Sequence, residues 1–127
     1  MLFKQTYVDM SRAAKTLLAF AVYVVLLGVA LLVAPATVIR ILRLPEIATG
    51  WARVVGLLAL VIGVYDFVAA RADVLPYIRA SVYVRIGFAV GIALLVVSGE
   101  MPVAALPIGA IDLGGALWTA WAMRGAR

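Results

Sequence analysis

The sequence predicts an all-α integral membrane protein, a bundle of four membrane-spanning helices with a short interfacial helix between spans one and two. Three observations predict this class. Of the 127 residues, 67% are hydrophobic and 13% are charged, whereas soluble domains are closer to half apolar and a quarter charged. The apolar residues gather in four runs of about 20 residues, the length of helix that crosses a bilayer. The alternation typical of barrel strands is absent, and backbone in lipid must bond to itself, so the runs are predicted to be helical.

A single transmembrane domain is predicted over residues 1–127, since the length suits one domain. Short connections at 71–77 and 98–102 predict antiparallel neighbours and a compact bundle. Pro107 is predicted to kink the fourth span, because its ring removes a backbone hydrogen bond. The four spans are predicted at about 16–36, 51–70, 80–98 and 102–123.

The segment between spans one and two combines apolar residues with arginines. Within 37–48, apolar side chains share one side of a helix while Arg40 and Arg43 reach outward. This pattern predicts a short helix at the membrane interface, ended by Pro45, with its arginines at lipid phosphates. Arg53, near the outer end of span two, is a third predicted headgroup contact.

The basic residues predict the orientation, since cytoplasmic loops of membrane proteins carry the excess of lysine and arginine. Seven basic residues fall on one side if both termini share it, and three fall on the other. Both termini are therefore predicted to be cytoplasmic. The seven are Lys4, Arg12, Lys15, Arg71, Arg79, Arg124 and Arg127, and the three are Arg40, Arg43 and Arg53.

Three ionisable residues, Asp66, Arg85 and Asp112, lie inside the predicted spans. A charge at the bilayer centre costs roughly 2.5–3.5 kcal/mol on insertion scales, a cost avoided by partners, water or neutralisation. Helical rise places Asp66 and Arg85 at similar depths, with Asp112 farther in. We therefore expect a buried Asp66–Arg85–Asp112 network, with Tyr65 or Tyr83 as hydrogen-bond partners.

Three interpretations of this network stay open from the sequence. It could be a structural salt bridge that orients three helices, although buried ions are weak evidence for stability. It could be a proton or solute site, because two carboxylates facing one guanidinium leave excess negative charge that a bound proton would relieve. The three groups could also make no direct contact.

Small residues recur within the spans, where they let helix backbones approach closely. Helix packing within the monomer, a dimer face and a ligand cavity are the three interpretations of this spacing. Around Asp112 the sequence also predicts a pocket lined by Tyr65, Tyr83, Gly114, Gly115 and Trp118, although Trp118 also suits an interfacial anchor. The predicted packing glycines are Gly56, Gly63, Gly87, Gly91 and Gly109.

The residue types that are missing exclude most catalytic chemistry. The chain has no cysteine and no histidine, which excludes disulfides, thiolate chemistry and histidine-based metal sites or catalysis. Neither a phosphate-binding glycine loop nor a nucleophile elbow is present. We predict no metal, no cofactor and no enzyme activity. The net charge of +5 is interpreted as basic flanks beside anionic headgroups, and no nucleic-acid partner is predicted.

The layout resembles a known family. Four spans, the entry WARVVG at 51–56, YVRIG at 83–87 and AIDLGGALW at 110–118 together resemble DoxX-like small bacterial membrane proteins over residues 14–124. The resemblance implies a multi-pass protein of the bacterial inner membrane. The family is functionally mixed, and some members are similar to membrane subunits attached to quinone-linked oxidoreductases. No site residue is carried over from it.

Three functions are compatible with these features. The first is an accessory or structural membrane subunit that forms a homodimer or a larger membrane complex. The second is a small proton- or cation-coupled transporter or channel, which needs a continuous polar path. The third is a binder of a lipid-like or quinone-like molecule within the bundle, which needs an apolar pocket with one or two polar contacts. The sequence favours the first, because few polar residues lie in the spans.

Overall fold

The computed structural model describes residues 10–125, and every regular element in that part of the chain is helical. Four helices are long and apolar enough to cross a membrane, so the predicted all-α class with four such helices is confirmed. Insertion into a bilayer and the interfacial position of the short helix stay predictions. The elements are α2 (Arg12–Val33), α3 (Pro35–Ile41), α4 (Thr49–Arg71), α5 (Leu75–Val97), η1 (Val103–Ala105) and α6 (Leu106–Gly125).

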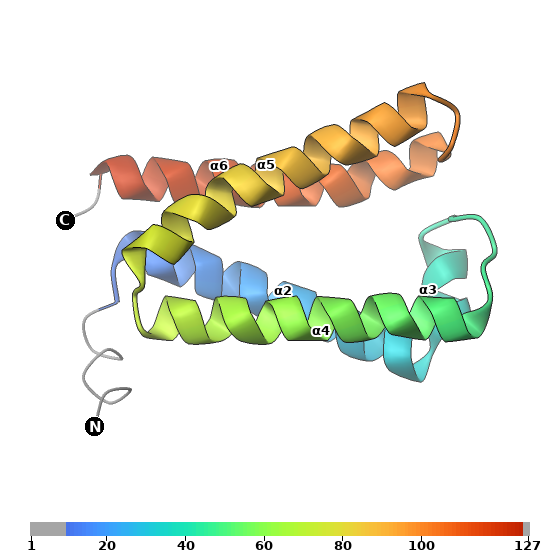
Figure 1. The fold of residues 1–127 in the computed structure, drawn as a ribbon, viewed down its shortest axis with the longest axis horizontal. Helices are drawn as coiled ribbons and strands as arrows, with labels where there is room; N and C mark the ends of the chain where they lie inside the picture. Colours follow the sequence, from blue (N-terminus) through green and yellow to red (C-terminus); the bar gives the residue numbers. More distant parts are fainter. Residues whose placement is uncertain (1–9, 126–127) are drawn as a thin grey trace.

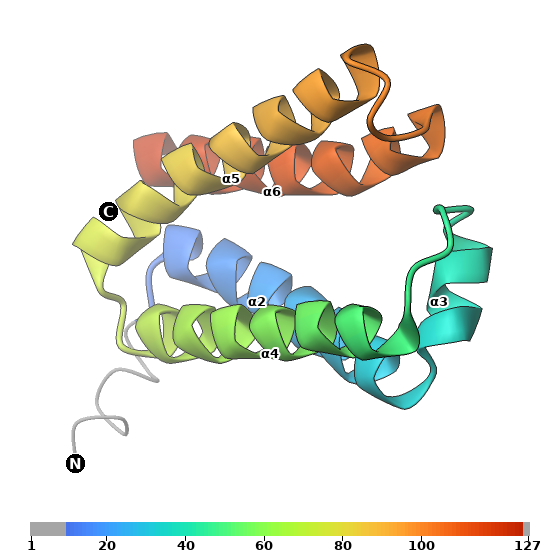
Figure 2. The ribbon, with the colours of Figure 1, turned by 45° about the vertical axis from the view of Figure 1, so that its right-hand side comes forward.

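The long helices form two pairs rather than one evenly packed bundle. Helix α2 packs mainly on α4, and α5 packs mainly on α6. Figures 1 and 2 show the pairs converging where α4 turns into α5 and separating toward the end that carries α3. The short 72–74 connection therefore joins two helices that diverge at once. The expectation that short connections join packed neighbours holds for α5 and α6 and is wrong for α4 and α5.

Glycines explain why α2 and α4 approach so closely despite the long segment between them. A Cβ built on Gly28 would lie 2.8 Å from the Gly56 carbonyl oxygen, and one on Gly56 would lie 2.9 Å from the Gly28 oxygen. A Cβ on Gly63 would lie 2.6 Å from Val25. The backbones thus touch where side chains are missing. Gly56 and Gly63 both lie in this contact, but Gly28, which meets Gly56, is not among the predicted packing residues.

The other predicted packing glycines fall into two groups, one packed against a neighbouring helix and one not. A Cβ on Gly109 would lie 3.2 Å from the Ile92 side chain, so this glycine sits in the α5–α6 contact. Around Gly87 and Gly91, no atom in the described part of the chain lies within 4 Å of a built Cβ. Packing within the monomer is therefore not the role of these two glycines.

Three helices end at a residue with positive φ, which lets the next backbone N–H groups bond back to the last turn. Arg43 (φ 57°) follows α3, Asp73 (φ 51°) follows α4 and Gly99 (φ 86°) follows α5. After each one, the following N–H bonds to a carbonyl five residues back, as from Leu44 to Ile39 at 3.1 Å. Helix α3 thus ends at Ile41, before the predicted stop at Pro45.

Prolines stand at helix starts, where the missing N–H is not needed. Pro35 is the first residue of α3, and Pro76 lies in the first turn of α5. Pro107 is the second residue of α6. Since no intrahelical bond is required from that position, Pro107 belongs to the start of α6, and the predicted kink inside the fourth span is corrected.

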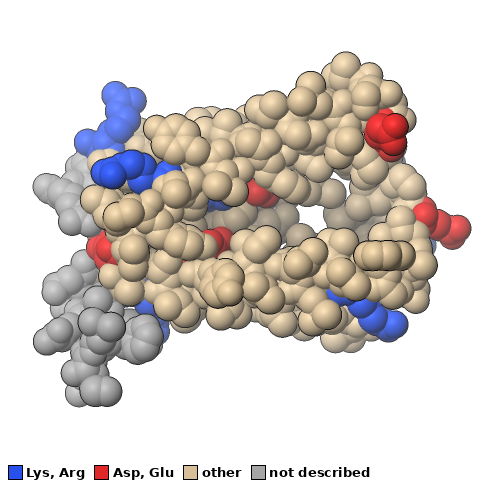
Figure 3. Space-filling model, viewed as in Figure 1, with Lys and Arg blue, Asp and Glu red and all other residues tan. Residues whose placement is uncertain are grey.

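The converging end of the molecule combines a basic surface with an apolar interior. Figure 3 shows basic side chains gathered at that end. In residues 10–125 this end carries five basic residues and one carboxylate, whereas the far end carries three basic residues and two carboxylates. Lys4 and Arg127 lie outside the described residues. Its interior is a cluster of buried apolar side chains. These are Ala13, Ala14, Leu17, Ala70, Ile78 and Ala122.

Candidate functional site

A buried polar network links three helices just beyond the apolar cluster. The Arg85 Nη2 atom of α5 donates a hydrogen bond to Thr119 Oγ1 of α6 at 3.0 Å. Thr119 Oγ1 lies 2.7 Å from Thr16 Oγ1 of α2, and one of the two hydroxyls donates to the other. All three side chains are at most 4% exposed. The hydroxyl contact between Thr16 and Thr119 therefore ties the two helix pairs together where they converge, and the guanidinium is bonded to it.

The rest of the Arg85 guanidinium is held within α5 and against an aromatic ring. Its Nε donates to the Ser81 carbonyl at 3.2 Å, and Nη2 also reaches Ser81 Oγ at 3.3 Å. Its central carbon lies 4.7 Å from the centre of the Phe20 ring, a cation–π distance. The remaining nitrogen, Nη1, is buried and has no hydrogen-bond partner in the described part of the chain.

Asp66 is held by a tyrosine that the sequence analysis does not single out. The Tyr77 hydroxyl of α5 donates to Asp66 Oδ1 at 2.6 Å, and Asp66 is 5% exposed. The predicted partners Tyr65 and Tyr83 are 63% and 71% exposed and make no hydrogen bond to the network. Tyr77 replaces them, because the α4–α5 connection brings the first turn of α5 beside Asp66.

Asp112 is only half-buried and lies on the same side of α6 as the network. Both Asp66 and Asp112 are near enough to the Arg85 guanidinium to interact electrostatically. Within residues 10–125, however, neither carboxylate lies within the 4 Å of an ion pair. Figure 3 shows acidic atoms in the middle of the molecule, beside the gap between the helix pairs. The three charges thus share one region without direct pairing, and the hydroxyls of Ser81 and Thr119 and the Ser81 carbonyl accept from Nε and Nη2 of Arg85.

Five residues of the network escape sequence reasoning, and two leave a detectable signal. Thr119 lies seven residues after Asp112, two turns along the same face, and Ser81 lies four residues before Arg85. A search for polar side chains at helical spacing from each intramembrane charge finds both. The other three network residues have no such spacing from a charge, because they lie on another helix or at the boundary of a span, and only the packing identifies them. They are Phe20, Thr16 and Tyr77.

Of the residues predicted to line a pocket near Asp112, only Gly115 lies in the network. A Cβ built there would lie 3.2 Å from Arg85 Nη1 and 3.3 Å from the Phe20 ring. Gly114 has open space around it, and Trp118 is 50% exposed. Of the predicted headgroup contacts, Arg40 and Arg43 are exposed, while Arg53 Nε donates to the Leu32 carbonyl at 3.0 Å and so caps the end of α2.

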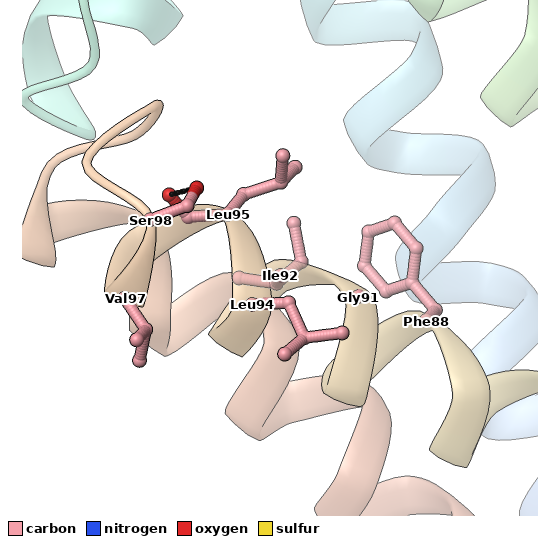
Figure 4. A pocket seen from close by; sticks show the side chains of 7 residues that line it. All are labelled: Phe88, Gly91, Ile92, Leu94, Leu95, Val97 and Ser98. Atoms are coloured by element: carbon pink, nitrogen blue, oxygen red, sulfur yellow. Dashed lines mark hydrogen bonds between the residues drawn. The ribbon is translucent and has the colours of Figure 1, made fainter.

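An apolar groove runs along the C-terminal half of α5, beyond the network. It has a volume of about 690 Å³. Figure 4 shows Phe88, Ile92 and Leu95 along one side of the helix, with Leu94 and Val97 on the other. In the described residues, no group of three or more acidic, histidine or cysteine side chains is placed to hold a metal ion.

The Tyr77–Asp66 contact predicts a measurable loss of stability. Tyr77→Phe removes the donor to a buried carboxylate and should lower the free energy of unfolding by about 1.5–3 kcal/mol, the usual value of a hydrogen bond to a charged group. Unfolding in mixed micelles measures it. Tyr65→Phe and Tyr83→Phe are the controls and should change nothing; an equal loss in all three variants would contradict the assignment.

Comparison of the chain with family models, curated proteins and solved structures gives no match, so the resemblance to DoxX-like proteins stays a prediction.

Proposed function

We propose that this chain is a multi-pass membrane protein of the bacterial inner membrane that serves as an accessory or structural subunit, with both termini in the cytoplasm. Four long apolar helices support the membrane location. The concentration of basic residues at the end where α2 begins and α6 ends supports the orientation.

The observation that carries the subunit role is the unpacked glycine face of α5. Gly87 and Gly91 lie one turn apart, and nothing in the described chain approaches them. Helices in lipid pack through close approach at small residues. Lipid tails are as apolar as the helix surfaces, so the hydrophobic effect does not drive the helices together. Glycines otherwise cost helix stability, so such a face is best explained by a neighbouring helix from a second copy or from another subunit.

The buried polar groups support a structural role over conduction. The Arg85–Thr119–Thr16 bonds hold the helix pairs together. At the basic end the network is covered by the apolar cluster, which includes Leu17 and Ile78. Toward the far end, α5 presents the apolar groove. A hydrated path through the monomer would have to cross both regions.

Site-directed photocrosslinking tests the subunit role. Because the chain has no native cysteine, only the introduced cysteine carries the label. Gly91→Cys labelled with a benzophenone maleimide should give one defined protein adduct in native membranes, of the mass of a dimer or of a fixed larger complex. The control is Leu26→Cys on α2, where the side chain is 63% exposed. Adducts of equal yield at both positions, or none at Gly91, would mean that this face meets only lipid.

A further inference from the structure

The unpartnered Arg85 nitrogen lies at a defined place on α6. Nη2 is bonded to Thr119, whereas Nη1 lies 3.2 Å from where a Gly115 Cβ would be. Gly115 is one turn nearer to Asp112 than Thr119 is. The guanidinium therefore lies along α6 with its unused donor toward the Asp112 end. Arg85 is 4% exposed, and a buried donor without a partner costs free energy that a bound acceptor would recover.

Asp112 supplies the complementary half of the site. It is three residues before Gly115, so both positions share one face of α6. Its carboxylate accepts no hydrogen bond from any described residue, and it is electrostatically coupled to Arg85 without forming an ion pair. A group between Arg85 Nη1 and Asp112 must accept from the first and donate to the second. A hydroxyl does both, while a carbonyl, a carboxylate or an ammonium does only one.

A stripe of apolar side chains leads from this point along α5. Phe88, Ile92 and Leu95 follow Arg85 at three, seven and ten residues, which places all four on one stripe of the helix. The last three line one side of the open groove of about 690 Å³, whose other lining residues, Gly91 among them, also belong to α5. Figure 4 shows their side chains on a common side. An alkyl chain fits this stripe, with its head at Arg85.

We infer that the cleft between the helix pairs binds a neutral amphiphile, with a hydroxyl head between Arg85 and Asp112 and an apolar chain along Phe88, Ile92 and Leu95. Charged heads fit poorly, because an anion would meet Asp66 and Asp112 and a cation would meet Arg85. The half-buried Phe20 ring, which lies 3.3 Å from the built Gly115 Cβ, borders the position of the head. An acylglycerol and a hydroquinone with an apolar tail both supply this hydroxyl chemistry.

A photoreactive long-chain alcohol tests the site on the full chain in phosphatidylcholine nanodiscs. With a diazirine in the tail of dodecanol, we expect labelling within residues 88–95. Unlabelled dodecanol should compete at least about tenfold better than dodecane, dodecanoate or dodecylamine, the factor expected for one hydrogen bond to a charged group. Competition against the labelled alcohol by a monoacylglycerol and, separately, by a hydroquinone then shows which of these two kinds of molecule binds better.

Neighbouring glycines provide a matched pair of variants. Gly115→Ala places a methyl group against Arg85 Nη1 and should reduce labelling about tenfold, as should Asp112→Ala, whereas Gly114→Ala enters open space and should leave it unchanged. Equal labelling of Gly115→Ala and Gly114→Ala would overturn the proposal and leave a water molecule as the bridge. If dodecane competes as well as dodecanol, the hydroxyl is not recognised and the groove is only a nonspecific lipid contact, which would also overturn the proposal.

Discussion

Gly28→Ala is expected to separate α2 from α4 and to lower the free energy of unfolding by about 2–3 kcal/mol, at the upper end of overpacking costs. The added methyl carbon would lie 2.8 Å from the Gly56 carbonyl oxygen and 2.9 Å from the Leu60 nitrogen. Both are backbone atoms, so no rotamer change relieves the clash and the helices themselves must move. The tightest helix pair in the molecule would then lose its contact.

Unfolding in mixed micelles, followed by tryptophan fluorescence, measures this loss. The matched control is Gly87→Ala, where a Cβ meets nothing within 4 Å. That variant should be unchanged or more stable by about 0.5–1 kcal/mol, because alanine favours helix more than glycine does. Equal stability of Gly28→Ala and Gly87→Ala would show that α2 and α4 do not pack through these glycines.

Arg85→Met is expected to cost about 3 kcal/mol or more, in the range for removing one partner of a buried charge interaction. The change removes the bond to Thr119 and takes away the Arg85 charge, which interacts with both Asp66 and Asp112. The double variant Arg85→Met/Asp112→Asn should recover part of this loss, because it removes one of the two uncompensated carboxylates.

A double-mutant cycle in micelles measures the coupling between Arg85 and Asp112. Arg53→Met is the control, since this arginine is exposed and bonds only the Leu32 carbonyl; it should cost less than about 1 kcal/mol. If the single and double Arg85 variants are equally damaged, the two charges do not interact, and Asp112 is free for a different role.

The intramembrane charges show how far sequence reasoning reaches. Asp66, Arg85 and Asp112 stand out because charge in an apolar run is costly, and the structure places them in one region. The hydrogen-bond partner of Asp66 was missed, since Tyr65 is adjacent in sequence but points outward, while Tyr77 comes from the next helix. Thr16 looks ordinary in the sequence, and its meeting with Thr119 depends on how α2 and α6 cross.

The sequence by itself determined the number, type and approximate ends of the long helices. Helical hydrogen bonds are local, and the lengths of the apolar runs are enough to predict the helices. Pairing was decided only by the tertiary structure. These helices are apolar on nearly every side, so no hydrophobic face marks which side turns inward. The choice depends instead on close contacts between distant glycines such as Gly28 and Gly56, and on the hydrogen bond between Thr16 of α2 and Thr119 of α6.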